Sequence, residues 1–263
     1  MSYLNKVTGY REDLLANRSV VKKDLYAIIE PDGIVKNTIP GFEKCDMTIL
    51  GTPKLGASFV DYLITCHPGG GNQEGFGGEG IQTFFYIFNG KVRVKTDGVE
   101  EVIGDTGYIY TAPGNKLYFE NIGDEPAFGF LYKRRYQELE GHFPHNVVGH
   151  AKDIPWVEYE GMKDVLVKDF LPSAENLGFD MNFHILSFEP GASHGYIETH
   201  YQEHGAYIYS GQGMYNLDNE WFPVKKGDYI FMGSYCLQAA YAVGRDEPLA
   251  YIYSKDCNRD VEI

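Results

Sequence analysis

The stretches Phe85-Tyr-Ile-Phe-Asn-Gly90 and Ala206-Tyr-Ile-Tyr-Ser-Gly211 repeat one pattern, an aromatic-rich run that ends in a small turn pair. Aromatic and β-branched residues favour strands, and Asn-Gly or Ser-Gly pairs favour the turns between them. Three such matches occur in the same order at offsets of 120 to 122 residues, which predicts a duplicated domain. The other two matches are His67-Pro-Gly69 with Glu189-Pro-Gly191, and Gly107-Tyr-Ile-Tyr-Thr-Ala-Pro113 with Gly227-Asp-Tyr-Ile-Phe-Met-Gly233.

Further strand-like runs flank these stretches, with turn residues at the spacing of about 8–12 residues that is typical of a sandwich or a closed barrel. Helical periodicity is absent except around Met162–Phe170, an ambiguous candidate for a short helix. Glycines and prolines interrupt Tyr136–Asp169, the expected connector between the two domains. Strands are expected over 58–67, 82–88, 91–96, 108–111, 116–120, 127–132, 181–189, 206–209, 214–217, 229–232, 237–243 and 249–253.

Composition supports an all-β class and disfavours several partners. Glycine supplies 31 of the 263 residues and aromatics make up 15%, which fits short strands joined by tight turns. The chain has 23 basic and 37 acidic residues, a net charge of −14, so its surface should repel phosphate backbones and anionic lipid. We therefore expect no nucleic acid and no membrane as partner. The basic run Lys133-Arg134-Arg135 is interpreted as a solvated strand end.

The termini and the cysteines indicate a compartment. The N-terminus lacks the apolar region of a secretory signal, and no stretch approaches the ~20 apolar residues of a spanning helix. None of the four cysteines belongs to a CxxC pair, so neither a zinc finger nor a redox motif is present. We expect a cytoplasmic protein whose thiols are reduced and structural: Cys45, Cys66, Cys236 and Cys257.

A second pattern, in the later half, carries chemistry. Gly191 precedes Glu198-Thr-His200 and His204, and Gly211 closes the frame; Gly227 precedes Gly233-Ser-Tyr235 and Gln238. This frame resembles the two motifs of the cupin family, a glycine with His-x-His and Glu, and a glycine with Pro-x-Gly and His. Each half looks like a cupin domain, so the chain resembles a bicupin. The resemblance implies two tandem double-stranded β-helix (jelly-roll) barrels, over 1–145 and 146–263.

In cupins the three His and the Glu of these motifs bind a metal inside the barrel. Residues i and i+2 of a strand share a face, so Glu198 and His200 should project together, and His204 can reach the same point after a short turn. Two imidazoles, a carboxylate and an amide oxygen suit Mn²⁺ or Fe²⁺ better than a thiolate-type zinc site, and another divalent metal stays possible. The resemblance implies four ligands: Glu198, His200, His204 and Gln238.

The first half serves as a control for this assignment. The same register places Gly77, Glu79 and Thr83 at the first-motif positions, and Tyr118 at the last histidine position. Glycine offers no donor atom and threonine is a poor ligand, which leaves Glu79 alone. We therefore expect the N-terminal barrel to bind no metal and to have a structural role, in packing or in an oligomer interface.

A closer resemblance covers nearly the whole chain. The N-terminal Gly9-Tyr-Arg-Glu-Asp-Leu-Leu15, the stretch Glu189-Pro-Gly-Ala-Ser-His-Gly195 and the C-terminal Tyr251-Ile-Tyr-Ser-Lys-Asp-Cys-Asn-Arg259 are closely similar to the (S)-ureidoglycine aminohydrolases. The Glu-His-His-Gln set is also that family's. This resemblance implies Mn²⁺-dependent hydrolysis of (S)-ureidoglycine to (S)-ureidoglycolate and ammonia during allantoin and purine breakdown.

The family pattern also implies roles for side chains outside the ligand set. Glu198 could handle a proton at the reacting carbon as well as bind the metal. Lys255 would pair with the substrate carboxylate, while Tyr215 and Tyr251 would hydrogen-bond the substrate. Each has an alternative: Lys255 could be a solvated strand end, and most of the 21 tyrosines must be packing residues.

Two other function classes stay open at this level. One is a different metal-dependent cupin enzyme, such as a dioxygenase, decarboxylase or isomerase, although these typically keep three His and one Glu. The other is a non-enzymatic cupin that binds a small metabolite, which would need a partner domain, commonly a helix-turn-helix, that the sequence does not show. A storage bicupin would have lost the ligands from both halves. We further expect a homo-oligomer, because duplicated cupins often assemble through exposed strand faces.

Overall fold

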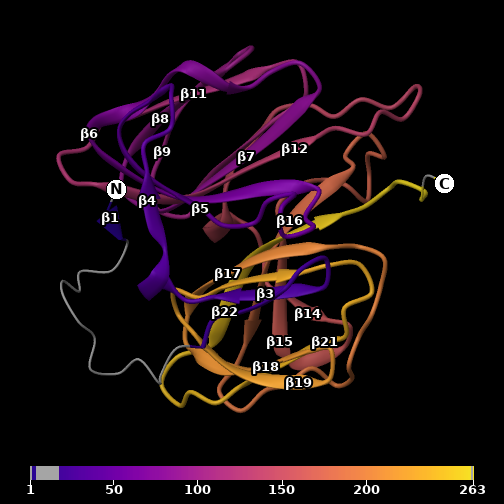
Figure 1. The fold of residues 1–263 in the computed structure, drawn as a ribbon. Helices are drawn as coiled ribbons and strands as arrows, with labels where there is room; N and C mark the ends of the chain where they lie inside the picture. Colours follow the sequence, from indigo (N-terminus) through magenta and orange to yellow (C-terminus); the bar gives the residue numbers. More distant parts are fainter. Residues whose placement is uncertain (1, 4–17, 262) are drawn as a thin grey trace.

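Two β-barrels lie one above the other in the computed structural model, which describes residues 2–3, 18–261 and 263 (Figure 1). The all-β, bicupin expectation is confirmed. The helices in the described residues are two single 3-10 turns, η2 (Pro31–Gly33) and η3 (Ala151–Asp153), and none is long and apolar enough to cross a membrane. The stretch 9–15, which contributed to the family resemblance, lies outside the described residues.

The N-terminal barrel is one curved sheet, held together by the 19-residue strand β6 (Phe59–Gly77). β6 pairs with β5 and β12 along its first part and with β11 along its second, so it bends from one layer of the barrel to the other. The other strands of this sheet are β1 (Ser2–Tyr3), β4 (Val35–Asn37), β5 (Phe42–Ile49), β7 (Ile81–Asn89), β8 (Val92–Thr96), β9 (Val99–Ile103), β10 (Gly107–Thr111), β11 (Lys116–Asn121), β12 (Ala127–Arg135) and β13 (Val147–His150).

The C-terminal barrel has an eight-stranded sheet facing a three-stranded one. The small sheet has the order β19 (Glu220–Lys225), β18 (Gln212–Leu217) and β21 (Gln238–Ala242). The large sheet has the order β14 (Val157–Tyr159), β15 (Met162–Asp169), β16 (Met181–Phe188), β22 (Leu249–Asp256), β17 (His204–Ser210), β20 (Tyr229–Met232), β3 (Tyr26–Ile29) and β2 (Val20–Lys22).

The barrels do not follow the expected division into 1–145 and 146–263. β3, an early segment, pairs with β20 and so completes the C-terminal sheet, as its indigo ribbon in the lower barrel of Figure 1 shows. β13 follows residue 146 but pairs with β10 in the N-terminal barrel. The division is therefore wrong at both ends, because each barrel covers an open sheet edge with a strand from the other half of the sequence.

One local expectation is also wrong. Met162–Phe170 is not a helix, because Val165 and Leu166 pair with Phe188 and Ser187 of β16 and extend the sheet. The expected connector Tyr136–Asp169 contains three strands, β13, β14 and β15.

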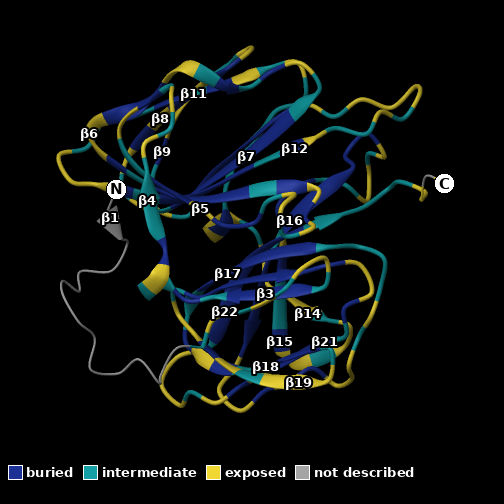
Figure 2. Ribbon diagram, in the orientation of Figure 1, coloured by how far each residue is buried: buried dark blue, intermediate teal, exposed yellow. Residues whose placement is uncertain are grey.

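An aromatic layer joins the barrels. Phe84 of β7 stacks on Phe183 of β16, with ring centroids 3.8 Å apart and planes 9° apart, and both rings are fully buried. Each barrel also has its own apolar core, and Figure 2 shows buried residues running through both. The shared layer belongs to a single cluster that draws residues from both halves of the chain. The two barrels therefore bury a common surface instead of being linked only by the chain.

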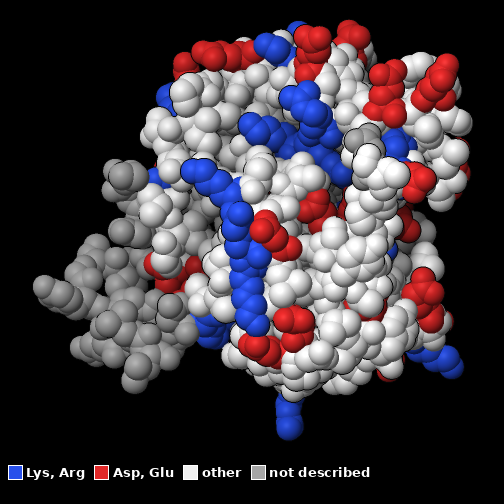
Figure 3. Space-filling model, turned by 45° about the vertical axis from the view of Figure 1, so that its right-hand side comes forward, with Lys and Arg blue, Asp and Glu red and all other residues white. Residues whose placement is uncertain are grey.

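Arg134 is a polar group at this interface, and its position differs from the solvated strand end that the sequence predicted. Arg134 is buried and its guanidinium approaches the backbone oxygen of Asp180 at 3.4 Å, so the basic run is not simply a solvated strand end. Gln82 donates to Asp180 at 2.6 Å and accepts from Tyr110 at 2.8 Å. On the face seen in Figure 3, several Lys and Arg side chains gather together, and Asp and Glu side chains lie mainly around them.

Candidate active site

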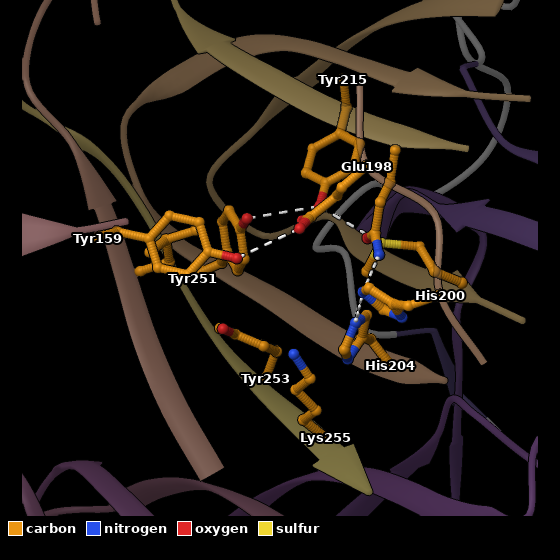
Figure 4. Close-up of a pocket in the computed structure, with 11 residues that line it drawn as sticks. Tyr159, Glu198, His200, His204, Tyr215, Tyr251, Tyr253 and Lys255 are labelled. Atoms are coloured by element: carbon orange, nitrogen blue, oxygen red, sulfur yellow. Dashed lines mark hydrogen bonds between the residues drawn. The ribbon is translucent and has the colours of Figure 1, made fainter. Parts of the chain in front are cut away.

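A small cavity lies inside the C-terminal barrel, and every residue that the sequence analysis assigned to a site lines it (Figure 4). These residues span 57 positions of the chain, from Glu198 to Lys255, so only the folded barrel brings them together. The lining consists of Tyr159, Leu186, Glu198, His200, His204, Tyr215, Met232, Gln238, Tyr251, Tyr253 and Lys255.

Strand geometry explains most of this convergence. On β22 the residues Tyr251, Tyr253 and Lys255 are spaced two positions apart, so all three face the cavity. His204 begins β17, whose residues Ala206 and Ile208 are paired with β22. The period-2 rule that predicted a shared face for Glu198 and His200 therefore applies more clearly to β22.

A two-residue bridge positions Glu198 and Gln238. Each backbone N–H of the pair donates to the carbonyl of the other at 2.9 Å, which makes an isolated antiparallel β-bridge. Directly opposed residues of such a pair send their side chains to the same side. The bridge therefore accounts for two of the four predicted ligands, which are 40 positions apart in the chain.

The imidazole rings of His200 and His204 point their Nε2 lone pairs toward each other. His204 Nδ1 lies 2.8 Å from the carbonyl oxygen of Ser254, and His200 Nδ1 lies 3.0 Å from that of Gln202. A carbonyl oxygen only accepts, so both Nδ1 atoms carry the proton and both Nε2 atoms carry a lone pair. Burial lowers the pKa of His204 well below its usual range and also lowers that of His200, which keeps both rings neutral.

The donor set fits a divalent cation. The two Nε2 atoms are 3.3 Å apart. They cannot form a hydrogen bond with each other, because neither Nε2 carries a proton in these neutral tautomers. Two nitrogens bound at right angles to one metal at about 2.1 Å would be separated by about 3 Å. Backbone carbonyls that fix the imidazole tautomer are the usual outer support of metal-binding histidines.

Gln238 completes one side of this group. Its side-chain amide lies 2.9 Å from His200 Nε2 and can present either its nitrogen or, after a half-turn, its oxygen to the same point. The described residues contain no cluster of three or more His, Cys, Asp and Glu side chains close enough to hold a metal. The convergent set is thus two histidines and a glutamine, with Glu198 beside it.

The carboxylate of Glu198 is turned toward a tyrosine. Tyr159 donates its hydroxyl to Oε2 at 3.2 Å, and the carboxylate keeps an exposed fraction of 18%. Burial raises the pKa of Tyr159, so this phenol remains a neutral donor. The Glu198 carboxylate is therefore held by a tyrosine hydroxyl, whereas the two histidine rings are held by backbone carbonyls.

The other predicted side chains form the opposite wall. The hydroxyls of Tyr215 and Tyr251 are 3.4 Å apart, and both residues are buried. Burial raises the pKa of both phenols, so they are neutral hydrogen-bonding groups. Lys255 is half-buried and lines the same cavity, so it is not a solvated strand end. The cavity thus holds one ammonium group and several neutral donors.

Sequence reasoning missed Tyr159 and Tyr253. Tyr253 had a usable signal, because it lies midway between Tyr251 and Lys255 on an alternating strand. Tyr159 had none, because it ends a three-residue strand that reaches the cavity only through its pairing with β15.

The corresponding positions of the N-terminal barrel are arranged differently. Gly77 has a φ of +90°, and a side-chain carbon there would lie 2.7 Å from the methyl group of Thr83, so these two positions already pack against each other. Glu79 and Tyr118 line a surface groove with Lys95 and Lys116.

Comparison with known proteins assigns a family. The chain is 64% identical to the (S)-ureidoglycine aminohydrolase of Escherichia coli (strain K12) over the full length of both chains. The chain belongs to the (S)-ureidoglycine aminohydrolase family. A protein named probable (S)-ureidoglycine aminohydrolase from Oryza sativa subsp. japonica is 32% identical over 92% of this chain and 76% of its own. A scan against protein-family profiles returned no match.

Solved structures agree with this family and with the cupin fold. The crystal structure of protein Ylba from E. coli has a TM-score of 0.86 at 60% identity, covering 97% of this chain and all of that one. A variant of Bacillus subtilis oxalate decarboxylase has a TM-score of 0.67 at 12% identity, over 97% of this chain and 86% of that one. The second likeness concerns the fold alone.

Proposed function

We propose that this chain hydrolyses (S)-ureidoglycine to (S)-ureidoglycolate and ammonia in the cavity of its C-terminal barrel, as a step of allantoin and purine breakdown. The observation that carries the proposal is the cavity itself: two neutral histidines with facing lone pairs lie together with Gln238, Glu198 and Lys255. The full-length identity of 64% to the E. coli aminohydrolase supplies the substrate.

The chemistry of the cavity suits this substrate. (S)-Ureidoglycine has a carboxylate, a ureido group and an amine on one carbon, so it needs a cation and several neutral hydrogen-bonding groups. Lys255 is the ammonium group that would pair with the carboxylate, and such charge-assisted bonds are the stronger ones. Tyr215 and Tyr251 offer two hydroxyls for the ureido or carboxylate end.

A divalent metal, Mn²⁺ by analogy with the family, would be held by His200, His204, Gln238 and Glu198. When bound, the metal supplies a positive charge that favours an anionic substrate and lowers the pKa of a coordinated water. The tautomers of both histidines are already set for this by Ser254 and Gln202, so these two ligands would not have to change tautomer on binding. Another divalent metal could fill the same place.

Glu198 is the group proposed to move a proton. Hydrolysis replaces the bond between the carbon and the leaving amine by a bond to water oxygen, so water gives up a proton and the amine gains one. One oxygen of the Glu198 carboxylate accepts a hydrogen bond from Tyr159, and lone pairs remain on the carboxylate. These lone pairs can accept the proton from water, and the carboxyl group can then donate a proton to the leaving nitrogen. Leu186 and Met232 contribute apolar side chains to the lining of the cavity.

The decisive experiment generates the unstable substrate in place. Metal-loaded protein is incubated with allantoate and an allantoate amidohydrolase, and both ammonia and the handedness of ureidoglycolate are measured. Enzymatic turnover should give a single (S) product, while the spontaneous reaction loses that bias. Racemic ureidoglycolate at the spontaneous rate would refute the proposal. Oxygen uptake without ammonia release would instead indicate a cupin oxygenase.

Three broader assignments belong to the same proposal. The chain would act in the cytoplasm, which fits four cysteines that are all free thiols. It would assemble as a homo-oligomer, with size-exclusion chromatography and light scattering as the test. Its N-terminal barrel would remain metal-free and support the catalytic barrel through the shared aromatic layer.

A further inference from the structure

A buried histidine outside the predicted ligand set lies behind Glu198. His194 has a side chain that is 1% exposed, in the segment between β16 and β17. Its ring packs edge-on against Phe188, with centroids 4.8 Å apart, and lies 5.9 Å from the ring of Tyr159. His194 does not line the cavity, so it can influence a reaction there only through a neighbour.

The tautomer of His194 is set by the backbone. The N–H of Ala240 donates to His194 Nδ1 at 2.8 Å, so the ring proton is on Nε2. Because Nδ1 accepts this hydrogen bond, it carries no proton, so the ring is an uncharged donor. This buried Nε2–H has no hydrogen-bond partner within the described part of the chain, although Glu198 Oε1 is 3.8 Å away.

A buried donor that lacks an acceptor is unusual and costly, and here a carboxylate oxygen lies just beyond bonding distance. A shift of about 1 Å would bring Oε1 to a normal hydrogen-bond length while Tyr159 still holds Oε2. Donors on both oxygens would then fix the plane of the carboxylate. Because both donors come from the barrel wall, the remaining lone pairs would face the cavity.

We propose that His194 is a positioning residue that, together with Tyr159, holds the Glu198 carboxylate in the orientation that accepts and returns the proton. The proposal rests on the function proposed above, since it presumes that Glu198 serves that reaction. His194 supplies this hold without adding a charge, so Glu198 remains a carboxylate that is hydrogen-bonded but not neutralised.

Two substitutions separate the two nitrogen atoms of the ring. In His194→Asn the amide oxygen can replace Nδ1 and keep the Ala240 bond, but nothing reaches Glu198. In His194→Gln the amide nitrogen has the reach of Nε2 and can donate to Glu198. With metal content confirmed, we expect His194→Asn to lose at least tenfold in kcat with KM within threefold, and His194→Gln to recover most of that loss. The reverse order, or equal rates in both variants, would overturn the proposal.

A second readout needs no turnover and uses metal-free protein. Proton NMR should show a slowly exchanging imidazole N–H signal that is absent in His194→Asn. The substitution Glu198→Gln should shift this signal, because it changes the acceptor; a signal unaffected by Glu198→Gln would refute the contact. If the contact is present and wild-type protein still gives racemic product at the spontaneous rate, then the proposed function fails and the contact stands.

Discussion

Single side chains decide the proposed site, and His200 is the first to test. Its Nε2 contacts both His204 Nε2 and Gln238, so His200→Ala removes the central member of the group. We expect metal content measured by plasma mass spectrometry to fall at least tenfold and ammonia release to reach background. Replacing the exposed His67 by Ala is the matched control and should change neither. Full activity of His200→Ala without metal would contradict the ligand assignment.

Lys255 tests substrate binding separately from metal binding. Loss of a hydrogen bond to a charged group costs about 1.5–3 kcal/mol, so Lys255→Ala should raise KM by roughly 10- to 100-fold. Metal content should stay at the wild-type level, because no ligand is removed. Steady-state kinetics on enzymatically generated substrate measures the effect. Unchanged KM would exclude Lys255 from the carboxylate site, and lost metal would mean that its role is structural.

The residue scale also shows where sequence reasoning succeeds. Glu198, His200 and His204 are close in the chain, and strand periodicity or a short turn brings them together, so their spacing carries the information. Gln238 and Lys255 needed the family pattern, because their contacts are long-range. Tyr159 and His194 carry no spacing signal. The pairing of β14 with β15 brings Tyr159 to Glu198, and the backbone bond from Ala240 sets the tautomer of His194; both depend on long-range contacts that the sequence does not show.

At the level of elements, strongly patterned strands were predictable and short ones were not. Each of the twelve expected strands overlaps an observed one, because aromatic runs and turn pairs mark their ends. β3 is an apolar four-residue run that gives no hint of β20, its partner some 200 residues later. Met162–Phe170 was ambiguous because Val165 and Val167 alternate as in a strand, while the flanking charges also fit a helix.

The pairing of β5 with β6 leads to a redox prediction. Cys45 and Cys66 are directly opposed on these strands, with sulfur atoms 3.5 Å apart. The hydrogen bond between the two thiols lowers the pKa of Cys45, which favours the reactive thiolate. Diamide, which accepts the two electrons and two protons, should join the pair as a disulfide.

Thiols counted under denaturing conditions should then fall from four to two, and peptide mapping should find Cys45 linked to Cys66. Cys66→Ser should abolish this change, while Cys236→Ser, which removes a buried thiol elsewhere, should not. A disulfide between other cysteines would show that the strand register does not govern the reaction.

At the scale of the whole molecule, the two barrels behave as one packed unit. Strands are exchanged between them, Phe84 stacks on Phe183, and Tyr229 of the C-terminal barrel donates to Asp61 of the N-terminal barrel at 2.6 Å. The duplication was readable from the sequence, but the exchange was not, because a repeat specifies two similar halves and not the edges at which they meet. The domain boundary is accordingly the part of the fold that was predicted least well.

Asp61 makes this interface sensitive to pH. It is fully buried, one of its oxygens has no hydrogen-bond partner within the described residues, and burial raises its pKa well above the usual range despite the bond from Tyr229. The folded state therefore holds the proton at pH values where the unfolded chain, with a pKa near 3.9, has released it. Stability must then fall as pH rises from about 4 toward the folded-state pKa.

Asp61→Asn removes this dependence, because the amide cannot ionise and its oxygen still accepts from Tyr229. Urea denaturation at pH 5.5 and 8.5 should show that the wild type loses more stability between the two values than the variant does, and that the variant is the more stable at pH 8.5. Substituting Asn for the exposed Asp124 should leave the difference unchanged. If Asp61→Asn is destabilised equally at both pH values, then the carboxylate is ionised and paired in the folded protein, and the barrels are held together there by its charge.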